Sequence, residues 1–285
     1  MILEPPSWST VELDAMRIGL GFVVFRRFST MRLLRPTEDL PHPVGIARVI
    51  DLRGATSPLV APWIRYAAYV ATLCYAAGVL VPLALPLLTA VVVADLTLRL
   101  SQGAVNHGHH LLAVVLTAQT AATALWIAAD HWSWHLSLLQ ESRDSTVVWW
   151  TVQAILAVYF TSGLSKLLNT RAHWIQRSPM LLMSAYSRLD TDRMNNEVSW
   201  RASDRAIAPI FWLFERPKIA QGVFAAGLLV ELVAPIGLLG KTVLTFTGLG
   251  LIGLHRGNTL LLGLSFTEFQ LLVLIYLVNV PQLLR

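Results

Sequence analysis

Long apolar runs separated by arginine-rich segments constrain this chain more than any other feature. Most of them approach or exceed the length of about 20 residues that an α-helix needs to cross a bilayer. The sequence therefore predicts an all-α, polytopic integral membrane protein, a helical bundle with seven or eight transmembrane helices in a single domain over residues 1–285. The runs cover residues 12–28, 60–81, 83–100, 109–129, 147–168, 219–239, 242–255 and 259–280. The first run carries Asp14 and Arg17, so it can instead lie in the membrane interface.

Composition agrees with this class of protein. Only 14% of the residues are charged, whereas soluble domains carry about a quarter. The pI of 9.7 is basic, but the arginines lie in loops beside apolar runs, where the positive-inside rule accounts for them. We therefore expect the lipid bilayer, and no nucleic acid, as a partner. The single cysteine, Cys74, excludes an intrachain disulfide and a cysteine metal cluster.

Two long polar segments, 29–58 and 169–218, predict the orientation of the chain. If all the runs cross, both segments lie on one side of the membrane, together with turns at 101–108 and 256–258. That side holds most of the loop arginines and lysines, so we expect it to face the cytoplasm of a cell's inner membrane. Within 178–216 we expect interfacial amphipathic helices rather than a separate domain, because the segment contains Trp200, Phe211, Trp212 and Phe214.

Lys166 lies near the end of the run 147–168, where an ionisable side chain is costly. An amine removed from water gives up its proton more readily than one in water, which can make it a base at neutral pH. Tyr159, Ser162, Gly163 and Lys166 follow the spacing of one helix face, and this polar, small-residue stripe favours a face turned into the bundle. The alternative is that Lys166 extends to the lipid headgroups.

A second polar cluster, Asn106-His107-Gly108-His109-His110, lies at the start of the run 109–129. Asn106, His107 and His110 can share a helix face. A neutral imidazole here can accept a proton or hydrogen-bond an amine. The competing interpretations are a metal site, which lacks a matched third ligand, and histidines that only cap a helix. We expect no bound metal.

Three further residues are candidates for a site. Glu231 lies in the middle of an apolar run, so it must be paired, protonated or turned into a cavity, and a structural pairing with Arg17 or another cation is as plausible as catalysis. His255 precedes the final run. Trp174 is expected at the membrane interface and can also form the wall of an aromatic ligand site.

These motifs together resemble the horizontally transferred transmembrane domain family, whose members include the vitamin K-dependent gamma-carboxylase. The resemblance extends from about Arg17 to the last run. It implies that Lys166 is the base that deprotonates a hydroquinone and that His107 positions this lysine. The resemblance depends on Asn106-His107 at the start of a helix, on Gly163-Leu-Ser-Lys166-Leu followed by Trp174, and on the late His255.

The resemblance implies an enzyme, a quinol-epoxidising oxygenase that uses O2 as co-substrate and requires no metal, flavin or haem. Its substrate would be a lipophilic quinol or dihydroxy-aromatic arriving from the bilayer, and its site would lie near the cytoplasmic face. Hydrogen bonds to the ring oxygens are expected from Asn106, His110 and His255, with Tyr159, Trp174 and Glu231 also lining the substrate site.

Two alternatives remain at the level of sequence. One is carboxylation of a glutamate-containing peptide bound by 169–218. The carboxylase carries a large region outside the membrane that has no counterpart after the last run here, so we expect the oxygenase first. The other is a non-catalytic membrane scaffold or quinone-binding protein, in which Lys166 and Glu231 are structural pairs.

Overall fold

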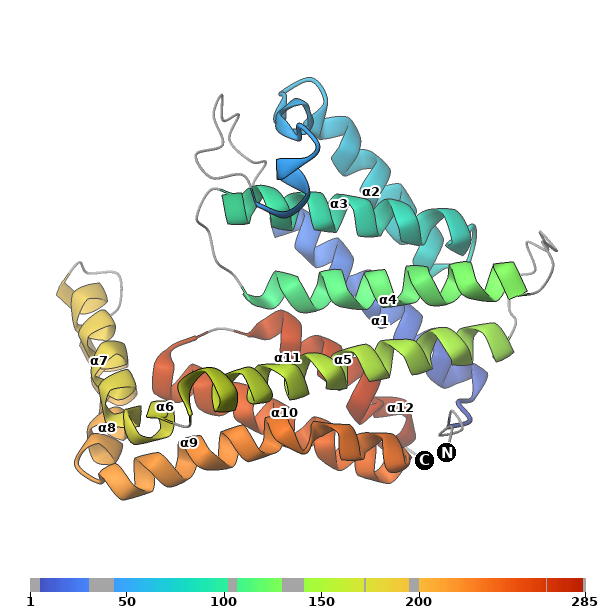
Figure 1. Cartoon of the computed structure of the whole chain (residues 1–285). Helices are drawn as coiled ribbons and strands as arrows, with labels where there is room; N and C mark the ends of the chain where they lie inside the picture. Colours follow the sequence, from blue (N-terminus) through green and yellow to red (C-terminus); the bar gives the residue numbers. More distant parts are fainter. Residues whose placement is uncertain are drawn as a thin grey trace. The chain divides into compact units, whose positions relative to one another are not determined.

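The computed structural model describes residues 6–30, 44–101, 107–129, 141–171, 173–194, 200–264 and 266–283. These residues form helices and short connections without a β-strand, as the apolar patterning predicts. The chain divides into two compact units, and Figure 1 shows their helices. Unit 1 is formed by Met1–Ile155 with Leu271–Arg285, and unit 2 by Leu156–Gln270. The sequence predicts a single domain. Whether the two units form one domain depends on how they associate, so the single domain stays a prediction.

Unit 1 is built from the first helices of the chain. Its core consists of aliphatic side chains that each helix buries on one face (Leu20, Val24, Leu85, Leu88, Leu112, Leu116 and Val152). A Cβ on Gly21 would lie 2.9 Å from the Cβ of Ala76, so only glycine allows this close packing of the first two helices. The helices are α1 (Thr10–Thr30), α2 (Ala61–Ala76), α3 (Val81–Ser101), α4 (His107–Ala129) and the first half of α5 (Glu141–Thr170), with the short η1 (Gly45–Arg48) and η2 (Arg53–Thr56) between α1 and α2.

The C-terminal segment of the chain completes unit 1. Helix α11 (Thr267–Val273) continues into η4 (Leu274–Val278), a turn of π-helix, and α12 (Val280–Leu283) follows. Asn279 ends the π-turn in the left-handed conformation, with φ of 51°. Its side-chain amide donates a hydrogen bond of 2.6 Å to the buried carboxylate of Glu12 on α1. This bond fastens the last helical segment to the first.

Unit 2 surrounds the second half of α5. Helices α7 and α8 pack against each other and against α9 and α10 through a core of Leu182, Ala185, Ile210, Leu213, Ala220 and Phe224. The elements are α6 (His173–Gln176), α7 (Ser178–Met194), α8 (Trp200–Phe214), α9 (Pro217–Leu232), η3 (Ala234–Leu239) and α10 (Lys241–Leu262).

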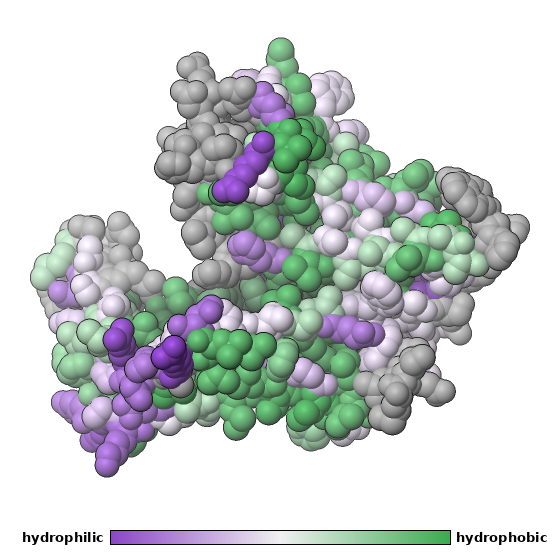
Figure 2. All heavy atoms as spheres, in the orientation of Figure 1, coloured by the Kyte–Doolittle hydropathy of each residue, from purple (hydrophilic) through white to green (hydrophobic). Residues whose placement is uncertain are grey.

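The described residues of the segment 178–216 are mostly helical, as predicted, because α7 and α8 cover 178–194 and 200–214. On α8 the aromatic side chains of Phe211, Trp212 and Phe214 are exposed although they are apolar. Charged groups gather where α8 leads into α9, and Figure 2 shows this hydrophilic corner beside the hydrophobic surface of α9. An exposed aromatic face next to basic residues is typical of an interfacial helix, and its location in a membrane interface stays a prediction.

Three of the described helices are long and apolar enough to cross a membrane: Val81–Ser101, His110–Ala129 within α4, and Arg143–Thr170 within α5. The structure is thus that of an all-helical chain compatible with a membrane protein. The other predicted spans correspond to helices that are shorter, more charged or less apolar. Helices α2 and α9 have 16 residues each, and α1 carries Asp14, Arg17 and Arg27. The count of seven or eight spans stays a prediction.

The turn predicted at 256–258 is wrong. Helix α10 continues through His255 and Arg256 to Leu262, and the chain leaves the helix only at Gly263, which adopts φ of 60°. The last helical segment accordingly begins at Thr267 rather than at residue 259. Polar residues suggested a break, but Thr259 satisfies its hydroxyl on the carbonyl of His255 one turn earlier, so the helix tolerates them.

Candidate functional site

The polar stripe of α5 faces the other helices of unit 2, as its spacing predicts. Tyr159 is buried, and its hydroxyl reaches His255 on α10. One turn later, a Cβ added to Gly163 would lie 3.0 Å from the Cβ of Glu231. Glycine therefore allows α9 to approach α5 at this level, which brings the carboxylate of Glu231 to Lys166 on the next turn.

Lys166 and Glu231 form an ion pair in which the Nζ atom lies 2.5 Å and 2.6 Å from the two carboxylate oxygens. The Glu231 side chain is only 7% exposed, whereas that of Lys166 is 40% exposed. The cation partner of the buried glutamate is thus Lys166 and not Arg17, which pairs with Asp14 and Asp144 in unit 1. Charge-assisted hydrogen bonds of this length hold the amine in one place.

Trp174 forms an aromatic wall beside the amine. The Nζ atom of Lys166 lies 5.7 Å from the centroid of the indole, within the range of a cation–π contact. Phe224 packs edge-on against the same indole, with 5.5 Å between the ring centroids. The indole Nε1 is buried and donates to no acceptor among the described residues. Trp174 therefore offers a hydrogen-bond donor that the described part of the protein does not use.

His255 is held in an aromatic cage. Its Nε2 atom lies 2.6 Å from the Tyr159 hydroxyl, and the histidine is only 4% exposed. The rings of Phe266 and Phe269 lie 4.9 Å and 5.2 Å from the imidazole, measured between centroids. Its Nδ1 atom is buried without a hydrogen-bond partner among the residues that the structure describes.

The two pairs are both built on α5, through Lys166 and through Tyr159. The site therefore combines a lysine–carboxylate pair, which can exchange a proton, with two buried nitrogens that lack partners within the described chain. Buried polar atoms without partners are rare, and a ligand or ordered water commonly accounts for them. The arrangement suits a ligand with an acidic hydroxyl and a further oxygen.

The structure brings together five of the residues predicted for the site: Lys166, Glu231, Tyr159, His255 and Trp174. Asn106 lies outside the described residues, as does the side chain of His107. His110 is half-buried on α4 in unit 1. Within the described ranges, the histidine, cysteine and acidic side chains form no group of three that could hold a metal ion.

Sequence reasoning missed the aromatic cage and a second polar cluster in unit 1. Phe266 and Phe269 were interpreted only as part of an apolar run, although they are three positions apart and can therefore turn to the same side. The unit 1 cluster had one usable signal, because Gln119 is an uncharged but polar side chain in the middle of the run 109–129.

Comparison of the chain with protein-family models, with curated proteins and with solved structures gives no match.

Proposed function

We propose that the protein is a membrane-embedded oxygenase that epoxidises a lipophilic hydroquinone with O2, using Lys166 as the general base. The observation that supports this best is the amine of Lys166, fixed by Glu231 and bordered by the indole of Trp174. A phenolic ring can stack on that indole with its hydroxyl directed at the amine. The resemblance to the horizontally transferred transmembrane domain family adds to the proposal.

Lys166 can act as a base although it is in an ion pair, because its ammonium proton can move to the carboxylate of Glu231. Proton transfer from the Lys166 ammonium to Glu231 across 2.5 Å leaves a neutral amine beside a carboxylic acid. The neutral amine then accepts the proton of the phenolic hydroxyl. Glu231 thus acts as the internal proton store, and the pair carries one more proton after the step than before it.

The remaining chemistry is driven by the substrate. The deprotonated ring attacks O2, a carbon–oxygen bond forms, and the O–O bond then breaks. One oxygen atom bridges two ring carbons as the epoxide, and the other leaves as water with the two hydroquinone protons. The ring supplies the four electrons that reduce O2. The indole N–H of Trp174 is suited to bind an oxygen on which negative charge develops, and so is His255 Nδ1 in the tautomer in which Tyr159 donates to Nε2.

The test is O2 consumption by the purified, detergent-solubilised protein with chelated metals and a panel of hydroquinones of different tail length. We expect consumption above autoxidation and a quinone product heavier by one oxygen atom. Lys166→Ala and Lys166→Arg should abolish both, because arginine keeps the charge but stays protonated. Lys218→Ala and Lys218→Arg are matched controls on an exposed lysine of the same unit and should retain activity.

Each other outcome contradicts part of the proposal. Activity in Lys166→Arg would exclude a general-base role for this lysine. Turnover that requires both a glutamate-containing peptide and CO2 would identify a carboxylase instead. No consumption over the whole panel by folded protein would favour a non-catalytic scaffold or quinone-binding protein.

A further inference from the structure

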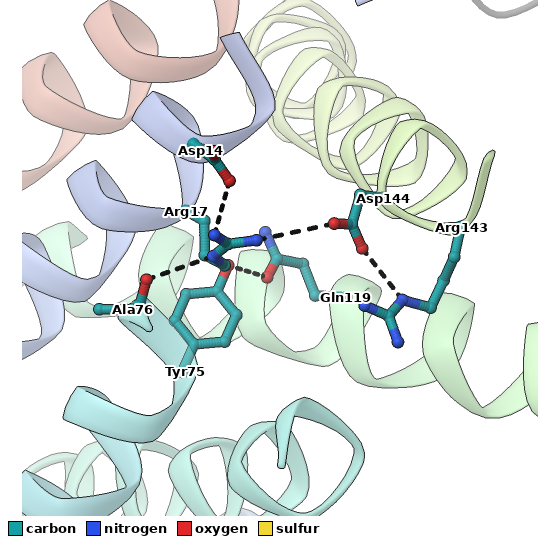
Figure 3. Close-up of polar contacts among 7 residues, drawn as sticks. All are labelled: Asp14, Arg17, Tyr75, Ala76, Gln119, Arg143 and Asp144. Atoms are coloured by element: carbon teal, nitrogen blue, oxygen red, sulfur yellow. Dashed lines mark hydrogen bonds and ion pairs between the residues drawn. The ribbon is translucent and has the colours of Figure 1, made fainter. Parts of the chain in front are cut away.

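Unit 1 contains a polar cluster built on two arginines, shown in Figure 3. Arg17 on α1 donates to Asp14 over 2.6 Å and to the carbonyl of Ala76 over 3.2 Å, and its Nη1 atom lies 3.7 Å from Asp144. Arg143 donates through Nε to the same Asp144 over 3.0 Å. The two guanidinium groups therefore share one carboxylate at the start of α5.

A cavity of about 30 Å³ lies against this cluster. A single water needs about 10–15 Å³ by this measure, so the cavity has room for a group larger than one water. Its polar lining comes from Arg17, Arg143, Asp144, Tyr75, Gln119 and Thr123. Gln119 bridges two tyrosines, because its oxygen accepts from Tyr75 and its nitrogen donates to Tyr276, each over 2.8 Å.

Donors exceed acceptors around the cavity. Of the Arg143 nitrogens, only Nε has a partner among the described residues, although the side chain is 9% exposed. The hydroxyl of Thr123 is also buried without a partner in the described part of the chain. A ligand for this cavity must therefore supply acceptor atoms.

The charge balance points the same way. The Asp14 side chain is 37% exposed, so water screens it, whereas Arg17, Arg143 and Asp144 are exposed by 14%, 9% and 18%. Of the charged groups that line the cavity, Arg17 and Arg143 are cations and Asp144 is the anion, so the lining carries one positive charge. Arginine does not lose its proton in proteins, so this charge is permanent.

We propose that the cavity binds one small monovalent oxyanion, a carboxylate or bicarbonate group. The flat fork of a guanidinium matches two oxygens of such a group, and Arg143 has its terminal nitrogens available for it. Thr123 supplies a further donor. The ligand neutralises the excess charge and fills the space. A free small ion and the carboxylate head of a fatty acid present the same chemistry. The site lies in unit 1, and its occupation does not depend on the function proposed for Lys166.

The experiment measures binding of radiolabelled acetate to the full-length protein in detergent, together with melting temperature in formate, acetate, bicarbonate or chloride at constant ionic strength. We expect saturable acetate binding and a higher melting temperature in the oxyanions than in chloride. Arg143→Gln should weaken binding roughly tenfold or more, because it removes a charged donor. Lys218→Gln makes the same charge change at an exposed site and should bind as the wild type does.

Thr123→Val keeps the proposal open to refutation if Arg143→Gln fails to fold. It removes one unpartnered hydroxyl without changing the charge, so the fold should persist while acetate binding weakens several-fold. Decanoate that binds more tightly than acetate would assign the site to a lipid head group, and decanoate that binds more weakly would assign it to a free ion. Equal melting temperatures in all four salts, or acetate binding unchanged in both variants, would overturn the proposal and leave a water-filled cavity.

Discussion

The polar clusters of the two units differ in the cation on which each is built. Unit 1 uses arginine, with Arg17 and Arg143 around Asp144, and unit 2 uses lysine, with Lys166 against Glu231. Arginine keeps its proton, so the unit 1 cluster carries a fixed charge that can bind and hold a partner. Lysine can release its proton, so the unit 2 pair can take part in proton transfer. In the two proposals made above, the choice of cation therefore separates a binding role from a chemical one.

Their connections differ as well. Arg17 contacts Asp14, Asp144 and the carbonyl of Ala76, so it ties α1 to α2 and α5. Lys166 contacts one carboxylate and one indole, and its side chain is 40% exposed. A largely buried group with three partners supports the fold, whereas a partly exposed group with fewer partners is accessible to a substrate. Four substitutions test this contrast.

The largest effect is expected from Lys166→Arg. The substitution preserves the positive charge opposite Glu231 but removes the neutral amine, so quinol-dependent O2 consumption should fall by about 10²–10⁴-fold. Thermal unfolding followed by circular dichroism should change little. If Lys166→Arg instead lost much stability while each folded molecule kept its activity, Lys166 would have the structural role that is assigned here to the arginine cluster.

Asp144→Asn removes the carboxylate that the two buried arginines share. Breaking a buried ion pair from one side leaves uncompensated charge, so we expect the free energy of unfolding to fall by about 3 kcal/mol. Asp14→Asn changes the partly exposed carboxylate of the same cluster and should cost less than about 1 kcal/mol. Equilibrium unfolding in mixed micelles compares the two, and equal costs would contradict a fixed charge centred on Asp144.

Gly163→Ala tests the close packing that positions Glu231. The new Cβ would lie 3.0 Å from the Cβ of Glu231, so α9 must shift. Overpacking of this kind costs about 1–3 kcal/mol, and it should also lower turnover by displacing the carboxylate from Lys166. Gly253→Ala on α10 meets no atom within 4 Å and serves as the control. Wild-type turnover in Gly163→Ala would show that the geometry of the pair is not needed for activity.

The smallest effect is expected in the hydrogen-bonded bridge of unit 1. Tyr276→Phe removes the acceptor of the Gln119 amide, which leaves a buried donor unpaired and should lower the free energy of unfolding by about 1–2 kcal/mol. Tyr66 is 65% exposed, so Tyr66→Phe should be close to neutral. Measured unfolding energies that do not differ between these two variants would show that Gln119 finds another partner.

The sequence predicted the helices well because long apolar runs permit little else. The runs 83–100 and 109–129 differ from α3 and α4 by two residues or fewer at each end. The error at 256–258 arose because His255 and Arg256 interrupt apolar residues, while the feature that stops the helix is the left-handed Gly263. Periodicity shows which residues share a face of a helix. It does not show the hydrogen bonds that polar side chains make within the helix, so polar residues inside a helix are easily mistaken for a turn.

The sequence predicted the features of the site that depend on one helix, but not the contacts between helices. The spacing from Tyr159 to Lys166 indicated a face turned inward, and the structure confirms that this face meets other helices. The partner of Glu231 was out of reach, because Lys166 is 65 positions away and Arg17 was an equal candidate. The shared use of Asp144 by two arginines depends on how α1 packs on α5, which no local pattern encodes.

The π-turn at Leu274–Val278 determines where this part of the chain tolerates a change in length. A π-turn accommodates one residue more than the α-helix around it. Deletion of a single residue inside the turn would restore a regular helix and leave the residues beyond it close to their present positions. Deletion of a residue from the regular helix α11 before the turn would instead rotate everything beyond it by about 100°. Tyr276 would then leave Gln119, and Asn279 would leave Glu12. In related chains, we therefore expect a change of length by one residue to be tolerated inside the turn and not in α11.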